Sequence, residues 1–274
     1  MPELPEVETI RAALDNFLAG RKIERVRIHE TRLRFPLDSQ ALLKYLPGQT
    51  INHVQRRSKY LVFLISNQAK MLIHLGMSGR LGIFRPSDFM EKHVHIIFDI
   101  DDHYELRFRD PRRFGFVEVI APETTSDYPR FASLGPEPLD DEFNSIYFAK
   151  ICRKTKRPIK NLLMDARAVV GIGNIYANEA LFFAGVNPCK PADQLTESQI
   201  DNLVKAAKDI LHKAIEKGGT TFRDYRNGFG EPGFFQFELA VYDRQTKPCK
   251  NCQSPIQRIK LSGRGTFICP RCQK

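Results

Sequence analysis

The amino-acid sequence predicts a multidomain α+β protein, with an N-terminal antiparallel β-sandwich led by a helix and a helical region behind it. Three observations predict this class. Short β-branched and aromatic runs crowd residues 22–120 without helical patterns between them. Amphipathic helical patterns follow, and four cysteines in a metal-ligand spacing close the chain. A length of 274 residues suffices for about two domains.

The first element expected is a helix that precedes the strands. Apolar residues recur on one face at helical spacing from Val7 to Leu18. Pro5 suits the first turn of this helix, and Gly20 suits its end. The strand-like runs that follow occupy residues 22–29, 50–66, 70–84, 94–100, 104–109 and 114–120. Because no helix separates these runs, we expect an antiparallel sandwich or barrel.

The composition changes after the last of these strands. Residues 121–138 are rich in Pro, Thr, Ser and Asp, and we interpret them as a linker. Thr196 and Gln199 fit a capping box ahead of a long amphipathic helix, and glycines follow it. The glycine-rich residues 220–235 are typical of a loop. We therefore expect an N-terminal domain at 1–135, a helical domain at 136–235 with a loop near 220–234, and a C-terminal domain at 236–274.

The C-terminal cysteines have the spacing of a structural metal site. Two Cys-x-x-Cys pairs stand sixteen residues apart, and their members are Cys249, Cys252, Cys269 and Cys272. This pattern predicts one structural zinc ion held by four thiolates. So short a segment cannot bury a core alone, so the metal would supply its folding energy. The residues between the pairs read as a β-hairpin with Arg264 near its tip, although Arg264 could equally be a solvated turn residue.

The charge distribution favours a polyanionic partner. Lys and Arg number 42 against 32 Asp and Glu, which gives a net charge of +10. Eight basic and no acidic residues lie from Arg244 to Lys274, and six basic and no acidic residues lie from Lys150 to Lys160. Such blocks repel themselves unless an anion neutralises them, and a phosphate backbone does so. Nucleic acid is the expected partner, and a basic protein without one is the alternative.

Membrane and secreted classes are not expected. No apolar run approaches the roughly 20 residues of a membrane span. The acidic, proline-rich residues 1–6 have neither the basic head nor the apolar run of a secretory signal. We therefore expect a cytosolic, thiol-reducing compartment, in which cysteines ligate a metal rather than pair as disulfides.

The N-terminus carries a candidate nucleophile. Pro2 follows the initiator Met, and removal of that Met would leave Pro2 as a secondary amine. Such an amine has an ordinary pKa near 8, well below that of Lys, so part of it is unprotonated at neutral pH. Attack on a sugar C1′ would give an iminium without an N–H to lose, which favours elimination of the C3′ phosphate. Glu3 lies beside it as a candidate general acid, and an ordinary terminal proline is the alternative.

Five motifs give the chain a family resemblance. They are PELPEVET at residues 2–9, QRRSKYL at 55–61, HLGMSG at 74–79, DPRRFG at 110–115 and GIGNIYA at 171–177. Together with the C-terminal cysteines, the chain resembles the formamidopyrimidine-DNA glycosylases, which are bacterial base-excision repair enzymes for oxidised purines. The resemblance spans nearly the whole chain. It implies a helix–two-turns–helix domain and a zinc finger behind the β-sandwich.

The resemblance implies a bifunctional glycosylase and lyase with four catalytic residues. Pro2 would attack C1′ and displace the base, and Glu3 would donate the proton that helps open the sugar ring. Lys59 resembles the family's proton donor for β-elimination, although from the residues alone a solvated strand lysine is as good an interpretation. Arg264 resembles the donor for the second, δ-elimination.

The resemblance also implies contacts with damaged double-stranded DNA. Met77, Arg112 and Phe114 resemble the residues that fill the space left by an extruded base, whereas core packing is the alternative for the two apolar ones. Other expected DNA contacts come from His74, His93, Lys156, Lys160 and Asn174. The loop at 220–234 resembles the lid over the flipped base. Asp243 stands where the family often has Gly, which puts the local turn geometry in question.

Two rival functions stay open at this point. An endonuclease VIII-like glycosylase would act on oxidised pyrimidines, but that family usually opens Pro-Glu-Gly-Pro-Glu, so Leu4 favours the purine branch. A non-catalytic zinc-finger protein would bind DNA through its basic blocks alone. We expect a monomer that works without a membrane, in the bacterial cytoplasm on nucleoid DNA.

Overall fold

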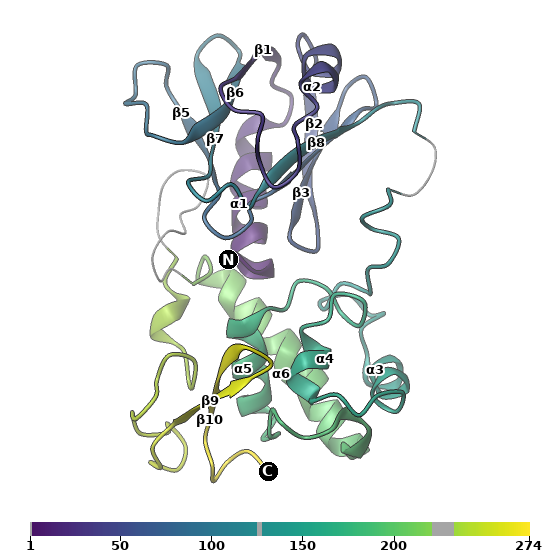
Figure 1. Ribbon diagram of the computed structural model, residues 1–274, viewed down its shortest axis with the longest axis vertical. Coiled ribbons are helices and arrows are strands. Elements are labelled where there is room, and N and C mark those ends of the chain that lie inside the picture. The colour runs from purple at the N-terminus through teal and green to yellow at the C-terminus, as the bar shows by residue number, and fades with distance from the viewer. Residues whose placement is uncertain (1, 125–127, 221–232) are drawn as a thin grey trace. The chain divides into compact units, whose positions relative to one another are not determined.

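The computed structural model describes residues 2–124, 128–220 and 233–274 and contains two compact units (Figure 1). One unit comprises Met1–Tyr128 with Gly218–Phe234, and the other comprises Pro129–Lys217 with Phe235–Lys274. The first is built on two β-sheets, whereas the second is built on helices and a C-terminal hairpin. The predicted α+β class is therefore confirmed. The cysteine-rich segment belongs to the helical unit, and a separate domain at 236–274 stays a prediction.

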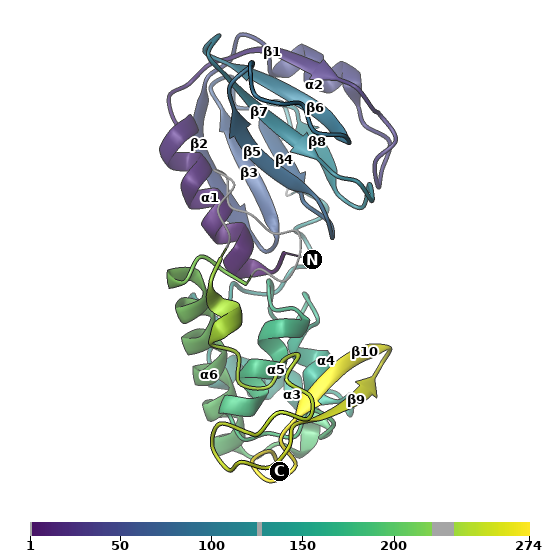
Figure 2. The same ribbon diagram turned by 90° about the vertical axis from the view of Figure 1, so that its left-hand side faces the viewer.

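The first unit begins with helix α1 (Leu4–Leu18), as its apolar periodicity predicts. Val7, Ile10, Leu14 and Leu18 are buried in the core of this unit. Helix α1 packs beside β2, as Figure 2 shows. A short helix, α2 (Ser39–Tyr45), follows β1 and was not predicted, because it buries only Leu42 and shows no apolar period.

Two four-stranded antiparallel sheets enclose the core. The first has the order β1 (Ile23–Ile28), β6 (Val94–Ile100), β7 (Tyr104–Arg109) and β5 (Arg80–Phe84). The second has the order β2 (Ile51–Arg57), β3 (Tyr60–Ile65), β4 (Lys70–His74) and β8 (Phe116–Ile120). The runs expected at 50–66 and 70–84 are thus each two strands, joined at turns. Apolar residues on the inner faces, such as Phe63, Phe98 and Phe108, fill the space between the sheets.

Two loops cross from one sheet to the other at the same corner. Residues 75–79 join β4 to β5, and residues 110–115 join β7 to β8. The strand ends are paired as His74↔Phe116 in one sheet and Arg80↔Arg109 in the other. Because both loops leave from paired strand ends, they lie side by side, and we call them the corner loops.

The second unit packs its helices around its own core. The helices are α3 (Ser145–Cys152), α4 (Ile159–Leu163), α5 (Asn174–Phe183) and α6 (Glu197–Glu216), with short 3₁₀ turns η1 (Ala192–Gln194) and η2 (Phe235–Phe237). The predicted capping box is confirmed, since Thr196 and Gln199 exchange side-chain to backbone hydrogen bonds at the start of α6. Buried residues of α5 and α6, such as Tyr176 and Leu203, form this core. Within the described ranges, no helix has the length and apolarity that a membrane crossing needs.

The chain ends in a two-stranded hairpin of β9 (Gln257–Leu261) and β10 (Arg264–Ile268). Ser262 and Gly263 form its turn, and both have positive φ, at 48° and 79°. Two positive φ angles match the twist of a two-residue hairpin, for which glycine is suited. The hairpin that the sequence predicts is confirmed.

Candidate functional site

The predicted nucleophile lies directly before α1. Pro2 is partly exposed, and Glu3 is the buried N-cap residue of the helix. The Glu3 backbone N–H donates to Glu6 Oε2 at 2.8 Å, which fixes the first turn. Residue 1 lies outside the described residues. The sequence-predicted pair Pro2 and Glu3 therefore stands at a well-ordered helix start.

Glu6 is a candidate site residue that sequence reasoning missed. Its carboxylate is buried, and besides the Glu3 amide it accepts the backbone N–H of Thr220 at 2.8 Å. Gly219 has a φ of 81°, and a Cβ on it would come within 3.0 Å of Glu6. Glu6 therefore links the helix start to the beginning of the loop that the sequence assigns to a lid. A Glu three residues after a Glu N-cap is the signal that could have pointed to it.

Lys59 lies in the turn between β2 and β3 rather than within a strand. Its neighbour Ser58 is buried and has a φ of 55°. Arg56 donates to Glu8 of α1 at 2.8 Å and to the Ser58 carbonyl at 3.0 Å. The basic cluster at 56–59 is thus attached to the N-terminal half of α1, the end of the helix that follows Pro2 and Glu3.

The corner loops bring the three predicted void-filling residues together. Met77 and Phe114 are 43% and 44% exposed, which contradicts core packing for both side chains. The Arg112 guanidinium carbon lies 4.7 Å from the centre of the Phe114 ring. A Cβ on Gly76 would stand 2.4 Å from the Phe114 backbone, so only glycine lets the Met77 loop approach this closely.

Asp110 organises this corner, and sequence reasoning missed it as well. It is fully buried, and its carboxylate accepts the Ser78 hydroxyl and the Gly115 N–H, both at 2.7 Å. Its backbone carbonyl contacts His95 Nε2 at 2.8 Å. One carboxylate therefore joins the two corner loops. The motif at 110–115 carries part of the family resemblance, but its spacing alone gives no sign that its acid is buried.

The two predicted histidines have different surroundings. His74 ends β4 and stacks on Phe116, with ring centres 5.6 Å apart. Its Nδ1 accepts the Gly76 N–H at 3.0 Å, so in the neutral ring Nε2 carries the proton and can donate. His93 is exposed before β6, with a φ of 69°. His74 pairs with Phe116 where β4 meets β8, and the His93 carbonyl accepts the N–H of Asp110, the first residue of the second corner loop. Both histidines therefore flank the corner loops.

The four predicted metal ligands form one cluster in the second unit. Their Sγ atoms all lie within 4.8 Å of one another. Cys249 and Cys272 are 3.8 Å apart, and Cys252 and Cys269 are 3.4 Å apart. Tetrahedral Zn–S bonds of about 2.3 Å separate their sulfurs by about 3.8 Å, so the set fits zinc. No other group of three or more such ligands occurs among the residues described.

The ionisation of these thiols also fits a dication. Hydrogen bonds from Ser254 lower the pKa of the Cys252 thiol to about 6. Burial and the neighbouring sulfurs raise the pKa of the Cys272 thiol to about 12. The Cys252 thiolate therefore forms readily, whereas the raised pKa values of Cys269 and Cys272 disfavour theirs, and a bound dication offsets the repulsion between thiolates.

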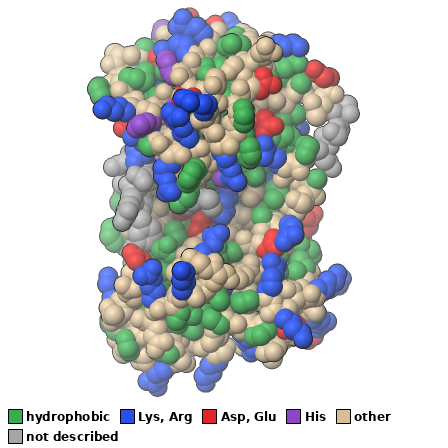
Figure 3. Space-filling model, in the orientation of Figure 1, with side chains coloured by type: hydrophobic (Ala, Val, Ile, Leu, Met, Phe, Trp, Pro, Cys, Tyr) green, Lys and Arg blue, Asp and Glu red, His purple; other side chains and the backbone are tan. Residues whose placement is uncertain are grey.

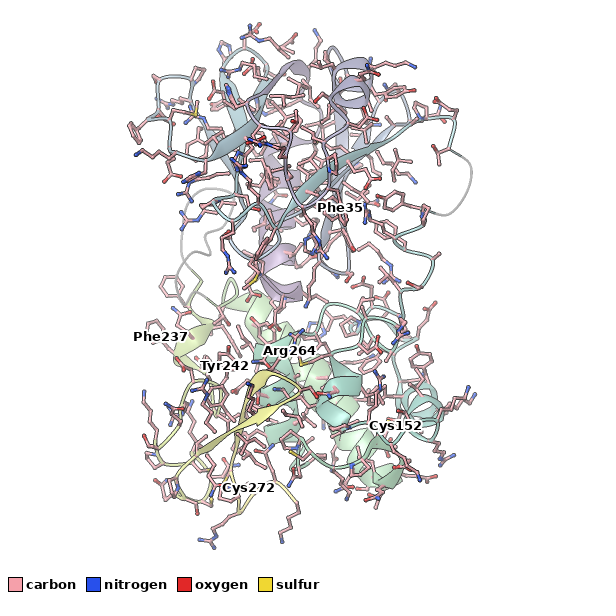
Figure 4. The ribbon with its side chains drawn as sticks, in the orientation of Figure 1. Phe35, Cys152, Phe237, Tyr242, Arg264 and Cys272 are labelled. Atoms are coloured by element: carbon pink, nitrogen blue, oxygen red, sulfur yellow. The ribbon has the colours of Figure 1, made fainter. Side chains whose placement is uncertain are left out.

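The remaining predicted residues of this unit lie at α4, α5 and the hairpin. Arg264 is exposed and opens β10, at the end of the hairpin away from Cys272 (Figure 4). Asn174 opens α5 directly after Gly173, as expected for an anion-binding helix start. Lys156 is exposed ahead of α4. Lysine and arginine side chains occur on the surface of both units in Figure 3.

The position of Lys160 differs from the one that a DNA contact would need. The sequence suggested that Lys160 contacts the DNA backbone, but its side chain is only 1% exposed. Its Nζ donates to the Thr266 hydroxyl at 2.7 Å and to the Gly265 carbonyl at 3.2 Å. The Lys160 ammonium is therefore hydrogen-bonded to the hairpin. Of the two lysines, Lys156 alone is exposed, and its contact with DNA stays a prediction.

Two other expectations concern the segments around the lid and the finger. Most of the predicted lid, residues 221–232, lies outside the described residues. Asp243 has a φ of 56°, a region that suits Gly, Asn and Asp. The replacement of the family's usual Gly by Asp at this position is therefore compatible with the turn.

Comparisons with known proteins cover the whole chain. The family models that match are the formamidopyrimidine-DNA glycosylase N-terminal domain at residues 1–117, the formamidopyrimidine-DNA glycosylase H2TH domain at 134–226, and the zinc finger found in FPG and IleRS at 247–274. The formamidopyrimidine-DNA glycosylase of Thiobacillus denitrificans is 45% identical over 274 residues, with both chains fully covered. The predicted helix–two-turns–helix region and four-cysteine zinc finger are confirmed.

Solved structures agree with these matches. The wild-type Lactococcus lactis Fpg in complex with DNA containing N7-benzyl-Fapy-dG has a TM-score of 0.92 and 36% identity, and both chains are covered completely. A complex of the same enzyme with DNA containing an abasic site has a TM-score of 0.92 and 37% identity, with 99% of each chain covered.

Proposed function

Because this chain belongs to the formamidopyrimidine-DNA glycosylase family, it is a DNA repair glycosylase with a zinc finger, and we propose that it removes oxidised purines and cleaves the strand through Pro2. The complex of the Lactococcus lactis relative with DNA containing N7-benzyl-Fapy-dG supports this substrate class, and its complex with abasic DNA supports action on the site left after base removal. We also propose that it works as a monomer on nucleoid DNA in the cytoplasm. The observation that carries the proposal is Pro2 directly before a buried Glu3 at the start of α1.

The first step replaces the base by the protein. Once Met1 is removed, the lone pair of the Pro2 nitrogen forms a bond to C1′ of the damaged nucleotide, and the C1′–N bond breaks with its electrons going to the base. The Pro2 nitrogen loses its N–H proton through solvent water, and the departing base takes up a proton. Glu3 then donates a proton to the ring oxygen as the C1′–O4′ bond opens. The result is an iminium between Pro2 and C1′, which is the electron sink for the later steps.

Two eliminations follow from this iminium. C2′ loses a proton to solvent water and the C3′–O bond breaks, so that the first phosphate departs with the electron pair. Lys59 would assist by supplying a proton near that phosphate. In the second elimination C4′ loses a proton to solvent water and the C5′–O bond breaks. Arg264 would hydrogen-bond the departing phosphate oxygen, which carries off the electrons. The product is a one-nucleoside gap flanked by phosphates.

The corner loops would hold the DNA open. Extruding a base from a duplex costs a few kcal/mol, and an exposed apolar wedge offsets part of that cost by filling the gap. Met77 and Phe114 are exposed large side chains on adjacent loops, and Arg112 lies over the Phe114 ring with donors for the orphaned base. Contacts from His74, His93, Lys156 and Asn174 to the backbone would fix the position of the duplex.

Borohydride trapping tests the nucleophile. Reduction during turnover of a duplex that contains 8-oxoguanine is expected to convert the iminium to a stable protein–DNA adduct. The Pro2→Gly variant is expected to lose most of this adduct while keeping its zinc content and melting temperature. A mass spectrum should show Met1 absent from the active wild-type protein. Undiminished trapping in the variant would move the nucleophile to a lysine.

A paired assay tests the substrate class. Excision is expected to be faster from duplexes that contain 8-oxoguanine than from matched duplexes that contain thymine glycol. A preference for the pyrimidine lesion would contradict the purine assignment and favour the endonuclease VIII-like alternative. Zinc-dependent DNA binding without any excision would favour the non-catalytic alternative.

A further inference from the structure

The outer edge of β10 is paired by side chains of helix α5. In an antiparallel pair, residues alternate between bonding to the partner strand and pointing their backbone groups away from it. The two-residue turn joins Leu261 to Arg264, which form the first hydrogen-bonded pair of the hairpin. The backbone N–H and C=O groups of Gly265 and Phe267 therefore point away from β9. Asn174 Nδ2 donates to the Gly265 carbonyl at 3.0 Å, and Asn178 Oδ1 accepts the Phe267 N–H at 2.8 Å.

The spacing of the two asparagines explains why they fit this edge. Residues four apart on a helix lie about 6 Å apart along its axis. Residues two apart on a strand lie about 6.6 Å apart. Asn174 and Asn178 are thus nearly in register with Gly265 and Phe267, one supplying a donor and the other an acceptor. The two amides take the place of a third strand, and we call them the amide ladder.

Of the two asparagines in the amide ladder, Asn178 is the one for which no DNA contact is predicted. Its side chain is buried at 1% exposure, and its Nδ2 donates to the Asn174 carbonyl at 2.6 Å. Both ends of the amide are therefore engaged, which fixes its orientation. Removing it leaves the buried N–H of Phe267 without its acceptor, and that costs more than a surface hydrogen bond.

We propose that Asn178 is a positioning residue for Arg264, acting through β10. This inference rests on the proposed function, because it concerns the second elimination. Arg264 is three residues before Phe267 on the same strand, at the tip of the hairpin. The metal ligands Cys269 and Cys272 fix the other end of that strand. The amide ladder thus fixes the position of the hairpin tip. Lys160 of α4 also donates hydrogen bonds to Gly265 and Thr266.

The test separates the two eliminations on one substrate. A single-turnover assay on a duplex with one abasic site measures the β-elimination and δ-elimination products by gel. Asn178→Ala is expected to slow the second elimination by about tenfold or more, because small displacements of a catalytic group cost that much. The first elimination and the borohydride adduct are expected to stay within about twofold of wild type, with one zinc per chain. Should Asn178→Ala fold poorly, Asn178→Ser keeps a polar group there but shortens its reach to Phe267.

A matched control and a double variant exclude a general loss of structure. Asn161 also bonds the hairpin, through the Ser262 hydroxyl at 2.6 Å, but it is partly exposed and does not pair with the strand edge. Asn161→Ala is expected to behave as wild type in both eliminations. In an Arg264→Ala background, Asn178→Ala should slow the second elimination no further, because it acts through Arg264.

Each other result counts against the inference. Equal slowing of both eliminations, an unchanged second elimination, or additive effects in the double variant would overturn it while leaving the proposed function intact. If Arg264→Ala alone keeps the δ-elimination product, the proposed role of Arg264 falls, and the role of Asn178 falls with it.

Discussion

Glu179 shows how much a single buried carboxylate can organise. It has no exposed surface, and burial raises its pKa. Its oxygens accept the backbone N–H groups of Ala240, Val241 and Tyr242 at 2.8–3.0 Å. Helix α5 thereby fixes the segment that leads into the zinc finger, one residue after Asn178 fixes the finger's hairpin.

Truncation of Glu179 should therefore be costly. Glu179→Ala leaves three backbone donors buried without an acceptor, and we expect a loss of about 3–5 kcal/mol in the free energy of unfolding. Glu179→Gln keeps an oxygen for Val241 and Tyr242 and should lose less. Urea unfolding measures both, with Glu216→Ala on the exposed end of α6 as a control expected within about 0.5 kcal/mol of wild type. Similar losses for Glu179→Ala and the control would contradict this role.

The burial of three carboxylates could not be predicted from the sequence, although the spacing of Glu3 and Glu6 is a helix-cap signal. Glu6, Asp110 and Glu179 each accept backbone N–H groups, and the partners of Glu6 and Glu179 include residues more than 60 positions away along the chain. In the sequence they look like ordinary surface acids, because burial depends on tertiary contacts that no local pattern encodes. Pro2, Glu3 and the cysteines could be found because their position or spacing in the sequence is enough to indicate their chemistry.

At the scale of elements, local signals predicted α1, α6 and the hairpin, but not the corner. A capping box, an apolar period and a turn glycine each act within a few residues. The adjacency of residues 75–79 and 110–115 depends instead on how β4, β8, β5 and β7 pair across two sheets. The sequence could therefore suggest Met77 and Phe114 by resemblance, but it could not show that the loops holding them lie side by side.

The loop after α4 carries a pH-sensitive contact. Hydrogen bonds from Arg167 and Arg157 lower the pKa of Asp165 to about 2. An unfolded Asp titrates near 3.9, so the stability that this contact contributes is fully present above about pH 4 and is lost as the pH falls toward 2. The Asp165 side chain is 15% exposed, but its partners are 45% and 72% exposed, so solvent reduces the contribution to about 1 kcal/mol.

Asp165→Asn should thus lower the free energy of unfolding by about 1 kcal/mol at pH 7. The difference from wild type should shrink as the pH drops from about 4, where Asp165 itself begins to be protonated in the unfolded chain. Urea titrations at pH 7, 5 and 3 measure this convergence. A difference that is the same at all three values would show that the contact contributes by packing rather than charge.

The net charge of the whole protein is +10, and its basic residues are clustered along the sequence. Residues within one cluster have different surroundings. Some basic side chains are engaged inside the protein, as Lys160 is with Thr266 and Arg157 is with Asp165. Others, such as Lys156, are exposed on the surface. A count of basic residues therefore overstates the number of DNA phosphates that the protein neutralises, and the salt dependence of binding should report the exposed set alone.

Lys156 offers the direct test of that distinction. Each phosphate contact contributes about 0.9 to the slope of log affinity against log salt concentration. Lys156→Ala should weaken binding to damaged and undamaged duplexes alike and flatten the slope by about one unit. Lys205→Ala removes the same charge from an exposed position on α6 and should leave the slope unchanged, because no DNA contact is expected there. Fluorescence anisotropy between about 50 and 200 mM salt covers the range in which these slopes are measured. Equal flattening by both variants would mean that net charge, rather than a contact at Lys156, sets the affinity.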